Sequence, residues 1–132
     1  MHAAALATSP IVLVVDDDVD ILQSVAELLV DEGYDVATAS DGRAALEQMR
    51  RGLRPDVILL DLMMPGMNGW DFRAEQMQDD NLKGIPVIVI TATDISDTAL
   101  KAQLGDIGLV RKPPTAEALL TVIRETCGEP IR

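Results

Sequence analysis

An apolar run that ends in an aspartate and a tight loop constrains the fold of this chain more than any other stretch. Residues 57–69 read VILLDLMMPGMNG, and the apolar run occupies residues 57–60. A continuous run of this length is typical of a strand that is buried on both faces of a parallel sheet. Because a carboxylate is costly to bury, we expect Asp61 at the point where the strand leaves the core. The proline and glycines that follow it predict a tight loop.

Strand patterns and helix patterns alternate along the whole chain. Short apolar or alternating runs predict five strands, and apolar residues at helical spacing follow each of them. This alternation predicts an α/β fold, in which a doubly wound, five-stranded parallel sheet is covered on both faces by five helices. The predicted strands are residues 11–15, 34–40, 57–60, 86–90 and 109–111, and the predicted helices are about residues 21–33, 44–52, 70–77, 97–104 and 115–128.

The length and charge of the chain limit what it can be. Its 132 residues fit one domain, and we expect a loose leader at residues 1–9, a domain at residues 10–128 and a tail at residues 129–132. The 22 acidic and 11 basic side chains give a net charge of −11. Affinity for nucleic acid depends on contacts between basic side chains and phosphates, so direct binding of DNA or of an anionic membrane is disfavoured. Divalent cations and basic partner surfaces suit this charge better.

The cysteine content and the amino-terminal stretch give no sign of secretion. Cys127 is the only cysteine, which excludes an internal disulfide and is compatible with a reducing cytosol. The start MHAAALATSP lacks a positively charged segment, and the apolar run IVLVV behind it is too short to span a membrane. We therefore expect a cytoplasmic location.

Polar residues stand at the carboxyl ends of four of the predicted strands. In chain order they are Asp16, Asp17, Asp61, Thr91 and Lys112. In a doubly wound sheet these strand ends lie along one edge, where ligands bind. We therefore expect the five side chains to form one site.

These residue types together supply the parts for phosphoryl transfer to an aspartate. Three carboxylates in one crevice repel each other, and a hard divalent cation such as Mg²⁺ relieves that repulsion by binding their oxygens. A lysine supplies a positive charge for a phosphoryl oxygen, and a threonine hydroxyl can donate a hydrogen bond to another. The set thus contains a nucleophile, metal ligands, a cation and a hydroxyl donor.

Four motifs resemble those of the receiver domain of two-component response regulators. They are VVDDD at residues 14–18, LLDLMMPGMNG at residues 59–69, VITA at residues 89–92 and RKP at residues 111–113. Each motif alone is weakly specific, but all four occur in the family's order and spacing, and the resemblance covers about residues 10–128. It implies a flavodoxin-like sheet with the strand order 2-1-3-4-5.

The resemblance also assigns roles to the acidic residues. Asp61 matches the aspartate that accepts a phosphoryl group from the phosphohistidine of a sensor kinase. Asp16 and Asp17 match the acidic pair that holds Mg²⁺ (or Mn²⁺), with Asp17 as the more direct ligand. Asp61 itself and the backbone carbonyl of Met63 are the other protein ligands that the family implies.

The switch residues match the family in part. Thr91 matches the hydroxyl that shifts toward the phosphoryl group, and Lys112 matches the lysine that pairs with it. The family's Lys–Pro bond is usually cis, which implies a cis peptide between Lys112 and Pro113. Leu109 occupies a position where many members have a Tyr or Phe that changes rotamer on activation, and Pro114 also replaces a frequent aromatic residue. We therefore expect Thr91 to move but the readout at this face to be altered or muted.

The implied function is that of a phosphorylatable switch in a phosphorelay and not of a turnover enzyme. A sensor histidine kinase or a phosphotransfer protein would donate the phosphoryl group, and the changed conformation would control a downstream protein or effector domain. We expect a monomer or weak dimer, with no direct binding of nucleic acid by this domain and no membrane association. The sequence is compatible with a stand-alone receiver and with one domain of a longer chain.

Three other functions are weighed against this one. A phosphatase or dehalogenase with an aspartyl nucleophile commonly carries a second acid two residues after the nucleophile, where this chain has Met63. A dinucleotide-binding domain is disfavoured because no G-x-G-x-x-G follows the first strand. A receiver-like protein-interaction module without phosphorylation remains the alternative.

Overall fold

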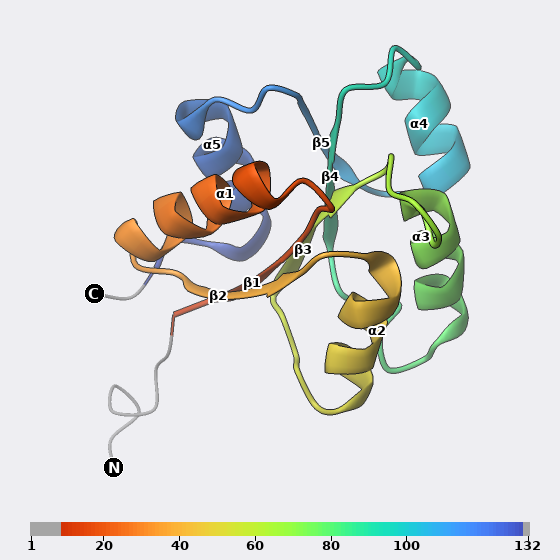
Figure 1. The fold of residues 1–132 in the computed structure, drawn as a ribbon, viewed down its shortest axis with the longest axis horizontal. Coiled ribbons are helices and arrows are strands. Elements are labelled where there is room, and N and C mark those ends of the chain that lie inside the picture. Colours follow the sequence, from red (N-terminus) through yellow and green to blue (C-terminus); the bar gives the residue numbers. More distant parts are fainter. Residues whose placement is uncertain (1–8, 131–132) are drawn as a thin grey trace.

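The computed structural model describes residues 9–130, in which five strands alternate with five helices (Figure 1). Apart from Ser9, the predicted leader lies outside the described residues. The strands are β1 (Ile11–Val15), β2 (Asp35–Ala39), β3 (Val57–Asp61), β4 (Val87–Thr91) and β5 (Gly108–Arg111). The helices are α1 (Val19–Asp31), α2 (Gly42–Arg50), α3 (Gly69–Gln78), α4 (Asp97–Leu104) and α5 (Ala116–Cys127).

All five strands pair in parallel in the order β2-β1-β3-β4-β5, which confirms the predicted sheet. Val15 at the end of β1 lies beside Ala39 of β2 and Leu60 of β3. The next residue of β3, Asp61, lies beside Ile90 of β4. The strand order reverses between β1 and β3, so a crevice is expected there, at the carboxyl ends of the strands.

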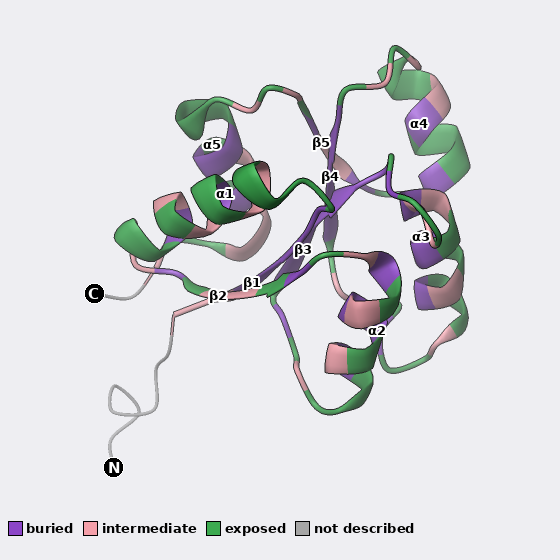
Figure 2. Cartoon of the chain, viewed as in Figure 1, coloured by how far each residue is buried: buried purple, intermediate pink, exposed green. Residues whose placement is uncertain are grey.

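The core forms two layers, one on each face of the sheet. Helices α1 and α5 cover one face, and α2, α3 and α4 cover the other (Figure 1). Side chains alternate along each strand, so that Leu59 packs toward α1 and α5 whereas Ile58 and Leu60 pack toward the other three helices. Figure 2 shows that burial concentrates in the strands, and all five residues of β3 are buried.

Side-chain caps determine where the helices begin. Each helix follows a residue whose side chain accepts a hydrogen bond from a backbone N–H of the first turn. Asp18 caps α1 and Thr115 caps α5. The side chain of Asp41 caps α2 by accepting from the N–H of Ala44. In chain order the capping residues are Asp18, Asp41, Asn68, Ser96 and Thr115.

One hydrogen bond fastens the end of α5 to the beginning of β2. Tyr34 is buried directly before β2, and its hydroxyl donates to the carbonyl of Gly128 at 2.9 Å. Since α5 runs back along the sheet, its last residue reaches the edge at which the strands begin (Figure 1). None of the helices described between residues 9 and 130 is long and apolar enough to cross a lipid bilayer.

The start of α3 touches the backbone of β3, which makes Gly69 sensitive to substitution. A Cβ atom at Gly69 would lie 2.7 Å from the Cα of Leu62 and 2.8 Å from the carbonyl oxygen of Asp61. These backbone atoms cannot yield without moving β3. We expect Gly69→Ala to lower the free energy of unfolding by about 1–3 kcal/mol, as overpacked sites do, although alanine favours a helix more than glycine.

Urea unfolding of Gly69→Ala measures this effect, and Gly84→Ala is the matched control. A Cβ atom at Gly84 would meet nothing within 4 Å, so that variant is expected to unfold like the wild type. Equal unfolding midpoints for both variants would contradict the steric argument.

Candidate functional site

The carboxyl edge of the sheet brings two buried aspartates together. Asp16 follows β1 and Asp61 ends β3, and because these strands are neighbours the two carboxylates lie close together. We refer to this part of the sheet edge as the crevice. Asp61 is 4% exposed and Asp16 is 3% exposed. Asp61 is the last residue of β3, as expected, and its carboxylate is still buried there.

The side chain of Lys112 compensates the buried charge. Its Nζ lies 2.9 Å from Oδ2 of Asp16 and 3.4 Å from Oδ2 of Asp61. The N–H of Met63 donates a hydrogen bond to Oδ1 of Asp61 at 3.2 Å. A buried carboxylate is tolerated when a cation and hydrogen-bond donors satisfy it, as these two groups do here.

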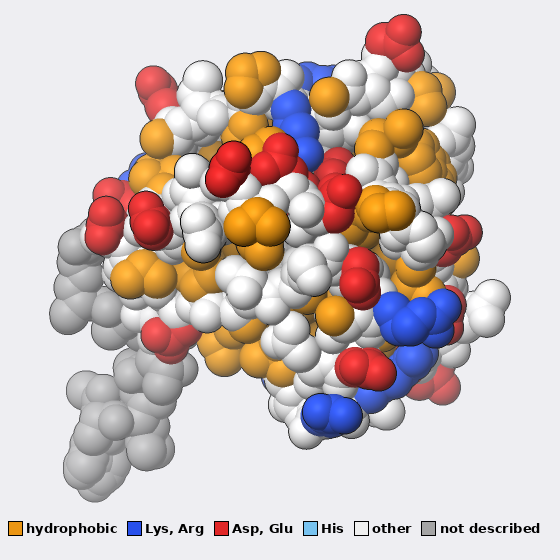
Figure 3. Space-filling view, viewed as in Figure 1, with side chains coloured by type: hydrophobic (Ala, Val, Ile, Leu, Met, Phe, Trp, Pro, Cys, Tyr) orange, Lys and Arg blue, Asp and Glu red, His pale blue; other side chains and the backbone are white. Residues whose placement is uncertain are grey.

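A third carboxylate gives the crevice the donors for a divalent cation. One carboxylate oxygen each from Asp16, Asp17 and Asp61 can be chosen so that all three lie within 4.8 Å of one another. Asp17 is exposed, so a cation can reach the cluster from solvent. Carboxylate oxygens around an open position suit Mg²⁺, which keeps several of its waters in proteins. Acidic side chains gather beside basic ones over the strand ends (Figure 3).

The crevice changes the acidity of its own groups. Burial, and next the charge of Asp16, raise the pKa of Asp61 from 3.8 to about 6, although Lys112 counteracts them. For Lys112 burial lowers the pKa, but the hydrogen bond to Asp16 and the charges of both aspartates outweigh it, so its pKa is raised. At neutral pH Asp61 is therefore largely ionised and Lys112 carries its proton.

Thr91 lies inside the sheet and not beyond its end. The predicted strand at residues 86–90 is shifted by one residue, because Thr91 pairs with Arg111 of β5 and is fully buried. The hydroxyl of Thr91 accepts a hydrogen bond from the N–H of Thr93 at 3.1 Å. Its carbonyl accepts from the N–H of Lys112 at 2.9 Å, which ties the two predicted switch residues to each other.

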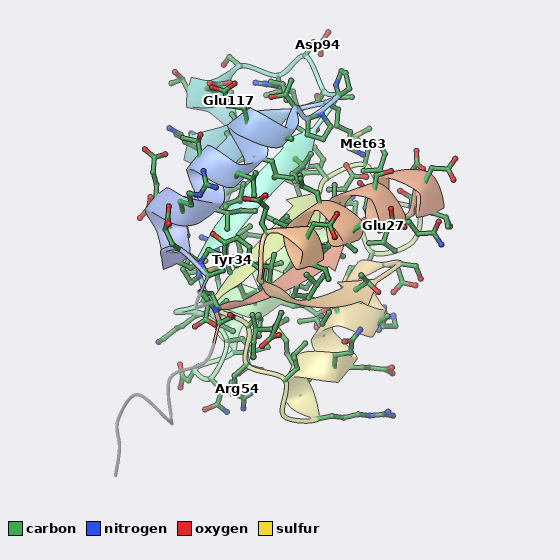
Figure 4. The ribbon with its side chains drawn as sticks, turned by 90° about the vertical axis from the view of Figure 1, so that its left-hand side faces the viewer. Glu27, Tyr34, Arg54, Met63, Asp94 and Glu117 are labelled. Carbon is green, nitrogen blue, oxygen red and sulfur yellow. The ribbon has the colours of Figure 1, made fainter. Side chains whose placement is uncertain are left out.

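The remaining predicted residues lie around this crevice. Leu109 of β5 is partly buried and packs against the core layer beneath α4. The peptide between Lys112 and Pro113 is cis, as expected. The side chain of Met63 is 61% exposed, and in Figure 4 it lies toward the same end of the molecule as Asp94, opposite Arg54. The role of the Met63 carbonyl as a ligand stays a prediction.

Sequence reasoning missed a buried polar pair on α3. Arg73 donates to the carbonyls of Leu104 and Asp106 and to Oε1 of Gln76. Gln76 is fully buried and donates to two carbonyls of the α3–β4 connection. A signal was present, because Gly69, Phe72, Arg73 and Gln76 follow the i, i+3, i+4, i+7 spacing of one helix face, so a buried glycine and phenylalanine imply a buried arginine and glutamine.

Comparisons with known proteins agree with this geometry. The family model described as "Response regulator receiver domain" matches residues 12–124. The "DNA-binding response regulator MtrA" of Mycobacterium tuberculosis H37Rv is 40% identical over 114 residues, which are 86% of this chain and 48% of that protein. The "Sensory transduction protein RegX3" of Mycobacterium bovis is 38% identical over 114 residues, with the same coverage of 86% and 48%. The chain thus spans about half the length of the curated relatives it matches.

Solved structures show the same fold. The chemotaxis protein CheY4 of Vibrio cholerae superposes with a TM-score of 0.80 at 36% identity, over 89% of this chain and 98% of that one. A CheY-like receiver domain protein from Methanospirillum hungatei superposes with a TM-score of 0.75 at 30% identity, over 89% of this chain and 94% of that one.

Proposed function

This chain belongs to the family of response regulator receiver domains, whose standard role is phosphoryl acceptance, and on that basis we propose that Asp61 is its phosphoacceptor. The observation that carries this assignment is the buried carboxylate of Asp61 with Nζ of Lys112 at 3.4 Å and two further carboxylates beside it. Receiver domains are signalling modules and generally not turnover enzymes. We propose that residues 10–128 form the receiver unit.

Each residue of the site has a defined part in the transfer. An ionised oxygen of Asp61 forms a bond to phosphorus while the bond between phosphorus and the donor's imidazole nitrogen breaks, and that nitrogen keeps the electron pair. Lys112 pairs with one phosphoryl oxygen, and the hydroxyl of Thr91 donates a hydrogen bond to another. Phosphorylation adds a charge of about −1.5 to −2, so the phosphoryl group is a stronger partner for Lys112 than the carboxylate of Asp16 or of Asp61.

The acidic cluster fits a divalent cation, and we propose Mg²⁺ (or Mn²⁺) as its resident. Asp16, Asp17 and Asp61 would hold the ion, together with the backbone carbonyl of Met63. When bound, the cation neutralises the carboxylates and the phosphoryl oxygens during transfer. The buried Asp16 remains hydrogen-bonded to the N–H of Asp18, which holds its carboxylate in the crevice.

The donor and the output follow from the family. We propose a sensor histidine kinase or a phosphotransfer protein as the donor, in the cytoplasm. The net charge of −11 disfavours direct contact of this domain with DNA, so the output is proposed to pass through a protein contact or an attached effector domain.

Intact-mass measurement after incubation with acetyl phosphate and Mg²⁺ tests the proposed function. We expect the wild-type chain to gain the mass of one phosphoryl group, and we expect EDTA to prevent it because three carboxylates then remain without a cation. Beryllofluoride, which mimics a phosphoryl group, distinguishes rapid hydrolysis from failure to react. If neither an adduct nor a beryllofluoride complex forms, the chain is a receiver-like interaction module without phosphorylation.

A further inference from the structure

The side chain of Arg111 fastens the loop between β4 and α4. Arg111 is the last residue of β5 and lies beside Thr91 in the sheet. Its Nη1 donates to the carbonyl of Thr93 at 2.6 Å, and its Nη2 donates to the carbonyl of Ile95 at 2.8 Å and pairs with Oδ1 of Asp97 at 2.5 Å. One guanidinium thus spans the connection from the end of β4 to the first turn of α4, in the upper part of Figure 1.

The loop conformation that Arg111 fastens is one in which the hydroxyl oxygen of Thr91 accepts a hydrogen bond from the loop itself. That hydroxyl oxygen accepts from the N–H of Thr93, and the hydroxyl of Thr93 accepts from the N–H of Ile95 at 3.4 Å. The N–H groups of residues 93 and 95 therefore turn toward the hydroxyls, and the carbonyls of the same two residues turn toward the guanidinium. Arg111 and the two threonine hydroxyls therefore stabilise the same conformation of the loop backbone.

Leu109, which lies two residues before Arg111 in β5, cannot replace this connection. Leu109 offers only packing, since its side chain has no polar atom. Among residues 9–130 the recorded polar links from β5 and Lys112 to residues 91–97 are the strand pairing, the Lys112 N–H to Thr91, and the three contacts of Arg111. Among residues 9–130, the guanidinium of Arg111 is therefore the β5 side-chain group that is hydrogen-bonded to this loop.

We propose that Arg111 is a positioning residue that holds the β4–α4 loop in the conformation in which Thr91 accepts from Thr93, and so sets how readily Thr91 turns to a phosphoryl group at Asp61. This inference rests on the proposed function of Asp61. Hydrogen bonds from a charged donor are stronger than neutral ones, so the two carbonyl contacts bear most of the effect. The exposed pair with Asp97 contributes little by itself and orients the guanidinium. A ligand that needs the loop to move must overcome these contacts.

Arg111→Met tests the proposal, because methionine keeps much of the aliphatic stem and removes every donor. Lys101→Met is the matched control, since it removes an equal charge from the exposed surface of α4. In the phosphate-free protein we expect the amides of Thr93 and Ile95 to exchange with solvent deuterium about tenfold faster in Arg111→Met, the effect of losing one or two net hydrogen bonds. Lys101→Met is expected to exchange like the wild type.

The second measurement is the affinity for beryllofluoride in the presence of Mg²⁺, compared with the affinity for Mg²⁺ alone. We expect Arg111→Met to bind beryllofluoride about three- to tenfold more tightly, with the affinity for Mg²⁺ unchanged, because only the phosphoryl mimic requires Thr91 to move. A variant that merely loosened the structure would bind it more weakly. Arg111→Lys, which has one ammonium in place of the guanidinium fork, is expected to bind beryllofluoride with an affinity between those of the wild type and Arg111→Met.

The outcomes separate this proposal from the proposed function. If the wild-type chain binds no beryllofluoride, the proposed function fails, and the role of Arg111 in phosphoryl response fails with it, whereas the exchange rates still show whether the residue fastens the loop. If the wild-type chain binds beryllofluoride but Arg111→Met binds it equally or more weakly, the proposal for Arg111 is overturned and Asp61 keeps its role.

Discussion

Asp61→Asn is expected to lose the phosphoryl adduct completely. A carboxylate oxygen attacks phosphorus, whereas an uncharged amide has no comparable nucleophile. The intact mass after incubation with acetyl phosphate and Mg²⁺ is expected to stay that of the unmodified variant. Asp97→Asn is the control, because it removes an exposed carboxylate outside the crevice and is expected to keep the adduct. An adduct on Asp61→Asn would move the acceptor to another carboxylate of the cluster.

The same variant is expected to be more stable than the wild type in the absence of metal. The folded-state pKa of Asp61, about 6, lies above the ordinary value of 3.8, so the folded protein binds this proton more tightly than the unfolded chain does. The stability that this tighter binding contributes is full below about pH 4 and is lost as the pH rises through about 6. At about pH 7.5 we expect Asn at this position to raise the free energy of unfolding by about 1–3 kcal/mol.

Urea unfolding in EDTA at two pH values isolates this effect. The stability difference between Asp61→Asn and wild type is expected to be large at about pH 7.5 and small at about pH 4, because the wild-type carboxyl is then protonated in the folded state and about half protonated in the unfolded chain. A difference that does not change with pH would mean that the ionised carboxylate is not the cause.

Arg73→Ala is expected to be strongly destabilising, by about 3–5 kcal/mol. The substitution leaves Oε1 of Gln76 and the carbonyls of Leu104 and Asp106 without the donors they use now, each at a cost of about 1–3 kcal/mol, and it opens a cavity beside the core. Burial lowers the pKa of the Arg73 guanidinium, and the charge of Asp106 offsets part of that effect. The network joins α3 to the end of α4 and to the loop before β5. Its loss is therefore expected to weaken the packing of this side of the sheet.

The control for Arg73→Ala is Arg43→Ala. Arg43 is exposed on α2, and its removal is expected to change the free energy of unfolding by no more than about 0.5 kcal/mol. Arg73→Lys is expected to recover part of the loss, because an ammonium can serve some of the acceptors but lacks the planar fork. If Arg73→Ala unfolded at the same urea concentration as Arg43→Ala, water would have to satisfy these acceptors as well as arginine does.

The strands and the central residues of the site could be predicted because they depend on patterns of apolar residues that are visible in the sequence. An apolar run such as residues 57–60 is compatible with few environments, and a parallel sheet then places the residue after each run at one edge. The proximity of Asp16, Asp61 and Lys112 follows from that rule. The confirmed strand order came from the family resemblance, since strand patterns alone do not order a sheet.

The features that were not predicted depend on tertiary contacts. Arg73 and Gln76 are polar, and nothing in the motifs singles them out, yet carbonyls at the end of α4 and in the α3–β4 connection lie where only a buried donor can reach them. Asp97 is exposed in the first turn of α4, and its pairing with Arg111 depends on how the β4–α4 loop folds back. The burial of Asp61 likewise depends on the lysine that the fifth strand brings to it.

The hydrogen bond from Tyr34 to Gly128 has a practical consequence for attaching this protein to a surface. It holds the last turn of α5 at the edge where the strands begin, and Ile11 starts β1 at that same edge. The carboxylate cluster lies at the other edge, where β1 and β3 end; Figure 1 shows those strand ends. A sensor chip or a dye coupled just after Gly128 would therefore leave the crevice facing away from the support, and a large phosphodonor could approach it without obstruction.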